Sequence, residues 1–146
     1  MSKTIKFLTI LTIGLIFTAC NGQNKSKDQS VDQSISKIEV IDFHSTHRCM
    51  TCNAIEANTK YTLDTYFSNE LKGNKITFQS INVDEKANEV IAEKFEAAGT
   101  SLFLNVIKDG KETQINLTDF AFMNGTNKEG FSEKLKAKID TELKTL

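Results

Sequence analysis

Apolar residues along this chain are spaced in ways that predict four strands. Residues 37–44, "KIEVIDFH", carry apolar side chains on both faces, which is typical of a buried strand, and residues 75–84 predict a second one. Residues 101–118 predict a β-hairpin, because Asp109 and Gly110 form a turn signal between two strand-like runs. We expect these strands to form one sheet.

Three other stretches have the three- and four-residue apolar spacing of amphipathic helices. Residues 52–67 predict the first helix, with Gly73 just past its end. Residues 85–99 predict a second helix that stops at Gly99, and a third begins at about Lys128. The order β-α-β-α-β-β-α implies two parallel crossovers and an antiparallel hairpin. It therefore predicts an α/β fold, a mixed central sheet with helices on both faces.

The first residues predict an export signal. Lys3 and Lys6 precede an apolar run, residues 7–17, that is too short to span a bilayer comfortably. The segment "LIFTAC", residues 15–20, resembles a bacterial lipobox, and by that resemblance Cys20 is the lipidated first residue of the mature protein. An uncleaved anchor or a buried thiol is the alternative. Either way, the domain is expected outside the cytoplasm.

The chain thus divides into a lipoprotein signal peptide (1–19), a flexible tether (20–36) and one domain (37–146). The tether is rich in Asn, Gln, Ser and Lys, and such a segment cannot bury enough apolar surface to become ordered. We expect the domain to be lipid-anchored to a membrane of the cell envelope, on its non-cytoplasmic side.

Composition and charge narrow the function classes. The chain has 146 residues, 39% hydrophobic and 25% charged, with a formal net charge of -1, which is ordinary for one globular domain. Acidic and basic residues balance, so the basic face that phosphate backbones require is missing. We expect no nucleic-acid partner.

The candidate chemistry lies in "HSTHRCMTC", residues 44–52, which holds two of the three cysteines. Cys49 and Cys52 follow the first strand and open the first helix, where unpaired backbone N–H groups lower the pKa of a thiol. Arg48 adds positive charge beside Cys49. Cys52, one helical turn later, is within reach to resolve a mixed disulfide. A purely structural disulfide is disfavoured, because closing so small a loop removes little unfolded-state entropy.

The strand, the CxxC pair that opens a helix and the later "LFLNVIKDGK" resemble the thioredoxin superfamily across nearly the whole mature domain. The phrase "FHSTHRCMTCNAIEANTKYTLDTYF" further resembles small thioredoxin-like bacterial lipoproteins known as nitrophenyl compound nitroreductase subunits. The resemblance implies a thioredoxin-like fold and thiol-disulfide exchange. It is no argument for nitroreduction, because the sequence contains no flavin motif; we expect no cofactor.

Asp42 interrupts the apolar first strand. Alternation places it on the face opposite Ile41 and Phe43. If it is buried, its raised pKa suits a proton acceptor that serves the Cys52 thiol, and the resemblance supports this role because thioredoxin has an acid in the corresponding strand. The alternative is an aspartate that faces water at the end of the strand.

His44 and His47 allow a second interpretation of the same window. An imidazole near a thiolate can stabilise it or shuttle its proton, and we assign His47 this supporting role. Both histidines with Cys49 and Cys52 also form a plausible ligand set for zinc or a soft metal. All four, however, crowd into nine residues without the intervening element that usually brings two ligand pairs together. Exposed loop histidines without a metal are the simpler interpretation.

The chain departs from the thioredoxin pattern because it contains no proline. The resemblance would place a cis-proline just before the third strand, where Gly99, Thr100 and Ser101 stand instead. We expect trans peptide bonds there, since a non-proline cis bond costs about 3 kcal/mol. Ser101 or Thr100 would then present a hydroxyl or an N–H group near the sulfurs.

The sequence therefore predicts a lipid-anchored thiol-disulfide oxidoreductase in which Cys49 attacks and Cys52 resolves. The supporting residues are Asp42, Arg48, His47 and Ser101. Its expected partners are protein or small-molecule disulfides and thiols. The alternatives are a metal- or metalloid-binding thioredoxin-fold protein and a non-catalytic partner subunit of a reductase.

Overall fold

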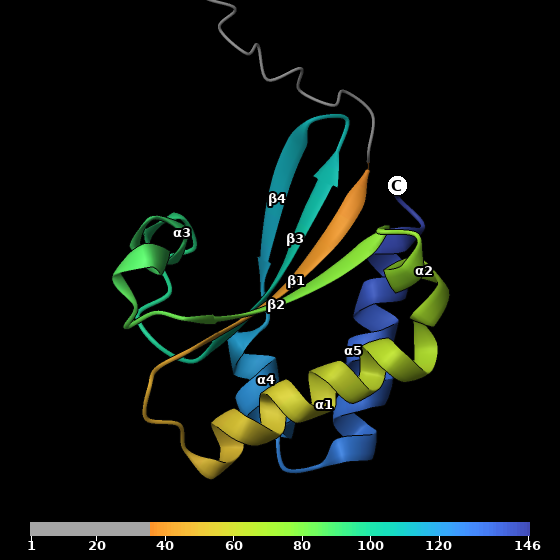
Figure 1. Cartoon of the computed structure of the whole chain (residues 1–146). Coiled ribbons are helices and arrows are strands. Elements are labelled where there is room, and N and C mark those ends of the chain that lie inside the picture. Colours follow the sequence, from red (N-terminus) through yellow and green to blue (C-terminus); the bar gives the residue numbers. More distant parts are fainter. Residues whose placement is uncertain (1–35) are drawn as a thin grey trace, which may run out of the picture. The chain divides into compact units, whose positions relative to one another are not determined.

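The computed structural model describes residues 36–146, in which four strands form one sheet in the order β2-β1-β3-β4 (Figure 1). β1 (Lys37–His44) pairs in parallel with β2 (Ile76–Asn82). β3 (Ser101–Lys108) runs antiparallel to both β1 and β4 (Lys111–Asn116). The predicted mixed sheet is confirmed. The hairpin turn is also confirmed, since both of its central residues have the positive φ of a type I′ turn.

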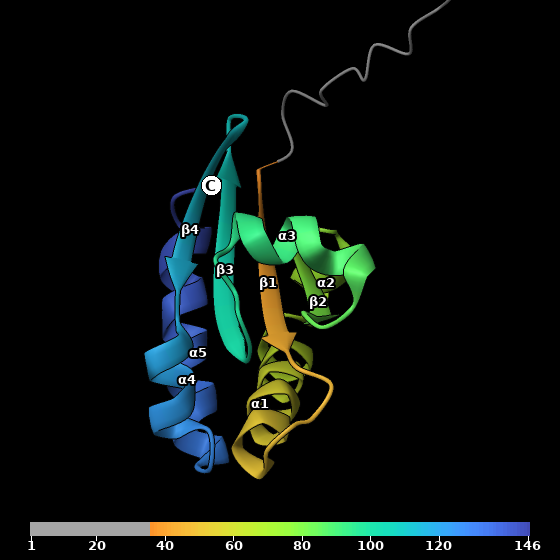
Figure 2. The same cartoon turned by 90° about the vertical axis from the view of Figure 1, so that its left-hand side faces the viewer.

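Helices cover both faces of the sheet, as the sequence predicts. α1 and α5 lie on one face, and α3 lies on the other (Figures 1 and 2). The helices are α1 (Met50–Tyr66), α2 (Ser68–Lys72), the 3-10 turn η1 (Lys86–Asn88), α3 (Glu89–Lys94), α4 (Thr118–Asn124) and α5 (Lys128–Leu143). The predicted β-α-β-α-β-β-α order is confirmed with α1, α3 and α5 in the predicted places, and the structure adds α2, η1 and α4.

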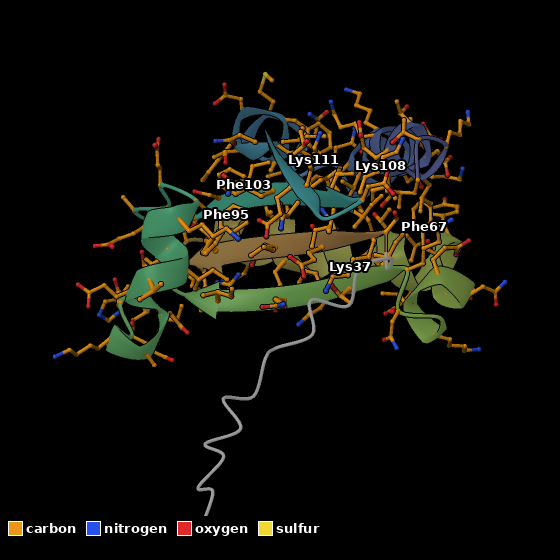
Figure 3. All side chains as sticks on the ribbon, turned by 90° about the horizontal axis from the view of Figure 1, so that it is seen from above. Lys37, Phe67, Phe95, Phe103, Lys108 and Lys111 are labelled. Carbon is orange, nitrogen blue, oxygen red and sulfur yellow. A yellow bond between two sulfur atoms is a disulfide. The ribbon has the colours of Figure 1, made fainter. Side chains whose placement is uncertain are left out.

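Each face of the sheet buries its own apolar cluster, and β1 contributes to both. Ile38 and Val40 pack with α1 and α5, whereas Ile41 and Phe43 pack toward α3. On the α3 side, the rings of Phe43, Phe95 and Phe103 have centroids 5.3 to 5.9 Å apart, and Figure 3 shows Phe95 and Phe103 together there. Strand alternation therefore fixes which face of β1 points toward α1.

The second predicted helix, residues 85–99, is shorter than expected, and α3 ends at Lys94. Glu96 takes a left-handed conformation with φ of 53°. Its N–H donates to the Glu93 carbonyl at 3.0 Å, and the Ala97 N–H donates to the Ala92 carbonyl at 2.9 Å. This pair of bonds is a Schellman motif. Glu96 rather than Gly99 therefore terminates the helix.

α4 is an additional helix that packs on the N-terminal half of α1. The Asn58 side chain donates to the Gly125 carbonyl at 2.8 Å. A Cβ atom on Gly125 would lie 3.1 Å from side-chain atoms of both Ile55 and Thr51. The close approach of α4 to α1 thus depends on a residue without a side chain.

The predicted signal peptide and all of the tether except Ser36 lie outside the described residues. Their boundaries, and lipidation of Cys20, stay predictions. Within residues 36–146, no helix is both long and apolar enough to cross a membrane.

Candidate active site

Cys49 and Cys52 lie where the chain leaves β1 and enters α1. Cys49 is the exposed N-cap of α1, and its Sγ accepts a hydrogen bond from the Cys52 N–H at 3.0 Å. Cys52 is buried, with 8% of its surface exposed. The two sulfurs form a disulfide. Because the same N–H can donate to a thiolate at Cys49, this position favours the reactive form of that cysteine.

Asp42 is fully buried, so the interpretation that it faces water is wrong. Its Oδ2 lies 3.2 Å from Arg48 Nη2 and accepts a hydrogen bond from Ser80 Oγ at 3.4 Å. Its Oδ1 has no hydrogen-bond partner within the described part of the chain. Burial raises the pKa of Asp42 from 3.8 to about 6, although the charge of Arg48 opposes this shift and that of Glu56 adds to it.

Arg48 lies between two carboxylates. Its Nη2 contacts Asp42, and its Nη1 forms an ion pair with Glu56. Glu56 in turn pairs with Lys60 one turn further along α1. We call these four alternating charges, Asp42, Arg48, Glu56 and Lys60, the charge chain. Partial burial raises the pKa of Glu56, but hydrogen bonds from Lys60 and Arg48 outweigh it, so the net direction is downward.

The charge of Arg48 is therefore engaged within the charge chain. The sequence predicts that this charge acts on Cys49, its neighbour in the chain. In the structure, the guanidinium also donates from Nη2 to the carbonyl of Cys52 at 3.3 Å. Arg48 thus contacts the turn that carries the buried cysteine.

The loop between β1 and α1 is held at the end of β2. The Thr46 N–H donates to Asp84 Oδ2 at 2.7 Å, and Asn82 Nδ2 donates to Thr46 Oγ1 at 3.1 Å. The hydrogen bond from the Thr46 backbone is the main reason that the pKa of Asp84 is lowered. His47 is exposed, and among the described residues no hydrogen bond joins it to either sulfur. Its supporting role stays a prediction.

The metal interpretation requires that several ligands converge. In the part of the chain that the structure describes, no three His, Cys, Asp or Glu side chains are grouped so that they could hold a metal ion. His44 instead directs Nδ1 toward the Ser45 carbonyl at 3.0 Å. His44, His47 and the two cysteines are thus not assembled as a ligand set here.

The segment before β3 lies beside the same loop. A Cβ on Gly99 would be 3.7 Å from Ser45 Oγ. All peptide bonds within residues 36–146 are trans, as expected for Gly99 to Ser101. Ser101 is half-buried, and its Oγ donates to the Gly99 carbonyl at 3.3 Å. Its hydroxyl is therefore engaged locally, and a contribution to the sulfurs stays a prediction.

The residues predicted for the site from the sequence did not include Glu56, Lys60, Ser80 or Asp84. One signal was available, because Glu56 and Lys60 have the i,i+4 spacing of a helical ion pair. Ser80 follows from register alone, since it lies opposite Asp42 in the parallel pair of β1 and β2.

Comparisons with known proteins give matches among solved structures. No protein-family model and no curated protein matches the chain. The chain is similar to thioredoxin from Fasciola hepatica, with 23% identity, 60% of this chain and 76% of that chain covered, and a TM-score of 0.40. It is also similar to the oxidized form of mitochondrial thioredoxin 3 from Saccharomyces cerevisiae, with 24% identity and a TM-score of 0.40. That match covers 64% of this chain and 77% of the thioredoxin chain. A malarial protein matches with 17% identity and a TM-score of 0.38, and the match covers 60% of this chain and 94% of the malarial chain.

Proposed function

We propose that this protein is a thiol-disulfide oxidoreductase that uses Cys49 and Cys52. One observation carries the proposal. An exposed cysteine caps α1 and accepts a hydrogen bond from the N–H of a second, buried cysteine, with the two sulfurs at bonding distance. Helix N-caps favour thiolates, and a second sulfur within reach allows a mixed disulfide to be resolved.

Reduction of a substrate would proceed in two exchanges. The Cys49 thiolate attacks one sulfur of the substrate disulfide, so the first substrate sulfur leaves as a thiolate and takes up a proton. Cys52 then loses its proton and attacks Cys49 Sγ, which releases the second substrate sulfur. Two electrons and two protons pass from the dithiol to the substrate disulfide. The reverse sequence oxidises a substrate dithiol.

The exposure of the two cysteines supports these roles. Cys49 is accessible to a partner, whereas Cys52 is 8% exposed and can be reached mainly from Cys49. Protein or small-molecule disulfides and thiols are the proposed substrates. The more specific resemblance to nitroreductase-subunit lipoproteins remains part of this proposal, and a non-catalytic partner subunit of a reductase remains its alternative.

Catalysed reduction of a fluorescent peptide disulfide by dithiothreitol tests the proposal. The protein should accelerate reduction, and Cys49→Ser should return the rate to the uncatalysed value because the attacking sulfur is lost. Met50→Ser is the matched control, since Met50 is 84% exposed beside Cys49 and carries no thiol. Equal rates with and without the wild-type protein would contradict the proposal. Stoichiometric bound metal that Cys49→Ser, Cys52→Ser and His47→Ala all remove would favour the metal-binding alternative.

We further propose that Cys20 anchors the protein to the non-cytoplasmic side of a membrane through attached lipid. Cys20→Ser should release the exported protein into the soluble fraction, because a lipid-modified cysteine would supply the apolar chains. Cell fractionation followed by mass spectrometry of the N-terminus measures this, and Cys52→Ser is the control that should remain on membranes. Retention of the Cys20→Ser protein on membranes would overturn the anchor.

A further inference from the structure

Arg48 joins the buried carboxylate to the turn that carries the resolving cysteine. A single nitrogen, Nη2, lies 3.2 Å from Asp42 Oδ2 and 3.3 Å from the carbonyl of Cys52. Nη1 pairs with Glu56. The Arg48 side chain is itself only 16% exposed. Asp42 and Cys52 are therefore neighbours across one guanidinium group, and the position of that group is fixed by three partners.

Among the groups around Asp42, Arg48 is the main countercharge. His44, two residues further along β1, also lowers the pKa of Asp42 through its charge, but by less than Arg48 does. Ser80 Oγ donates from β2, and Leu102 lies opposite on β3 and supplies no charge. From α1, Glu56 contributes a second negative charge. Arg48 forms the ion pair with the buried carboxylate. Only Oδ2 is used in these contacts, so Oδ1 is a buried acceptor that remains open within the described residues.

We propose that Arg48 is a positioning residue that keeps Asp42 ionised, with Oδ1 free to take the proton of Cys52. This inference rests on the proposed function. In the step concerned, the Cys52 S–H proton passes to Asp42 Oδ1, directly or through a water molecule. The Cys52 thiolate then supplies the electron pair for the bond to Cys49 Sγ. The bond between Cys49 and the substrate breaks, and the departing substrate sulfur keeps its electron pair and is protonated by Asp42 or by solvent.

Loss of Arg48 and loss of Glu56, the two inner members of the charge chain, should shift the pKa of Asp42 in opposite directions. Without the Arg48 charge, the pKa of Asp42 would rise further, so a larger fraction of the carboxyl would be protonated at neutral pH and unable to accept a proton. Without the Glu56 charge, the pKa of Asp42 would fall, because Glu56 opposes its ionisation. A role in packing alone would impair both variants in the same direction.

The resolving step can be isolated with an aromatic disulfide whose released thiolate absorbs visible light. In the reduced full chain carrying Cys20→Ser, attack by Cys49 releases a first thiolate, and resolution by Cys52 releases a second. The rate of the second release is measured from pH 5 to 9. In the part of this profile where the rate rises with pH, the rising limb, Arg48→Gln should shift the curve to higher pH by about one unit. At a given pH on that limb, resolution would then be about tenfold slower. Glu56→Gln should move the limb downward, and Arg48→Lys should stay near the wild type because it keeps a positive charge.

Two comparisons separate the possible failures. Adding Arg48→Gln to Asp42→Asn should cause no further shift, because the acceptor is already gone. An unshifted limb in Arg48→Gln, or equal shifts in Arg48→Gln and Glu56→Gln, would overturn the role of Arg48. Absence of a second release in the wild type would instead overturn the proposed function itself.

Discussion

Cys52→Ser is expected to hold a partner protein in a covalent mixed disulfide, whereas Cys49→Ser holds none. Cys49 is exposed at the N-cap of α1 and makes the first attack, and Cys52 releases the partner in the second step. When Cys52 is a serine, the first step still occurs but the second cannot. Cells that export the Cys52→Ser protein should therefore contain adducts that migrate slowly on non-reducing gels and disappear on reduction.

The control for this trap is the double variant Cys49→Ser with Cys52→Ser, which has neither sulfur in the window. Cys20 would remain in all three variants, so any adduct formed through Cys20 would appear in each of them. Adducts of equal amount in Cys49→Ser and Cys52→Ser would mean that the two cysteines do not have the assigned roles.

The second large effect is the pH dependence that Asp42 gives to the stability of the folded protein. Asp42 should lower the free energy of unfolding of the wild type as the pH rises from about 4 through about 6, and this contribution should reach about 3 kcal/mol once the pH is well above 6. Burial raises the pKa of Asp42 to about 6 from an ordinary 3.8, so the folded state holds this proton more tightly than the unfolded state. The resulting stabilisation is complete below the ordinary pKa and is lost once the pH passes the folded value.

Asp42→Asn should remove this decline, because an amide has no proton to lose. Urea unfolding at pH 4.5, 5.5, 6.5 and 7.5 measures the difference between the two proteins. Asp84→Asn is the control. The pKa of Asp84 is lowered by the Thr46 N–H, so its contribution is lost as the pH falls below its ordinary value and leaves the slope between pH 5 and 7 unchanged. Parallel curves for the wild type and Asp42→Asn would show that the folded protein does not perturb this carboxyl.

Features of the fold that depend only on residues adjacent in the sequence could be predicted from the sequence. The alternation in β1 correctly places Asp42 on the face opposite Ile41 and Phe43, because side chains on a strand alternate regardless of what surrounds it. The hairpin turn at Asp109 and Gly110 follows for the same reason, since the required positive φ is a local property.

The ends of α3 and the presence of α4 could not be obtained in this way. A glycine is the usual signal for the left-handed residue that ends a helix, but here Glu96 takes that conformation and Gly99 does not. The short α4 has a weak local signal, and its position depends on contacts of Ala121 and Gly125 with distant parts of the chain.

The cysteine pair of the candidate site was visible in the sequence, but the charge chain was not. Cys49 and Cys52 lie close together because of their spacing at a helix start. The contact between Arg48 and Asp42 depends on the path of the loop between β1 and α1, which the hydrogen bond from the Thr46 N–H to Asp84 Oδ2 helps to hold. Loop conformation of this kind depends on tertiary contacts rather than on local sequence pattern.

An equilibrium titration of the Cys49 and Cys52 pair tests most directly whether it is a reversible redox couple. The chain carrying Cys20→Ser is equilibrated with defined ratios of reduced and oxidised dithiothreitol or glutathione, and free thiols are alkylated and counted by mass. A redox-active pair should give one two-electron transition with a midpoint above about −300 mV. Across it, the ratio of oxidised to reduced protein should change tenfold for every change of about 30 mV in the potential of the buffer. A disulfide that stays oxidised well below about −300 mV would be a structural crosslink and would contradict the proposed function.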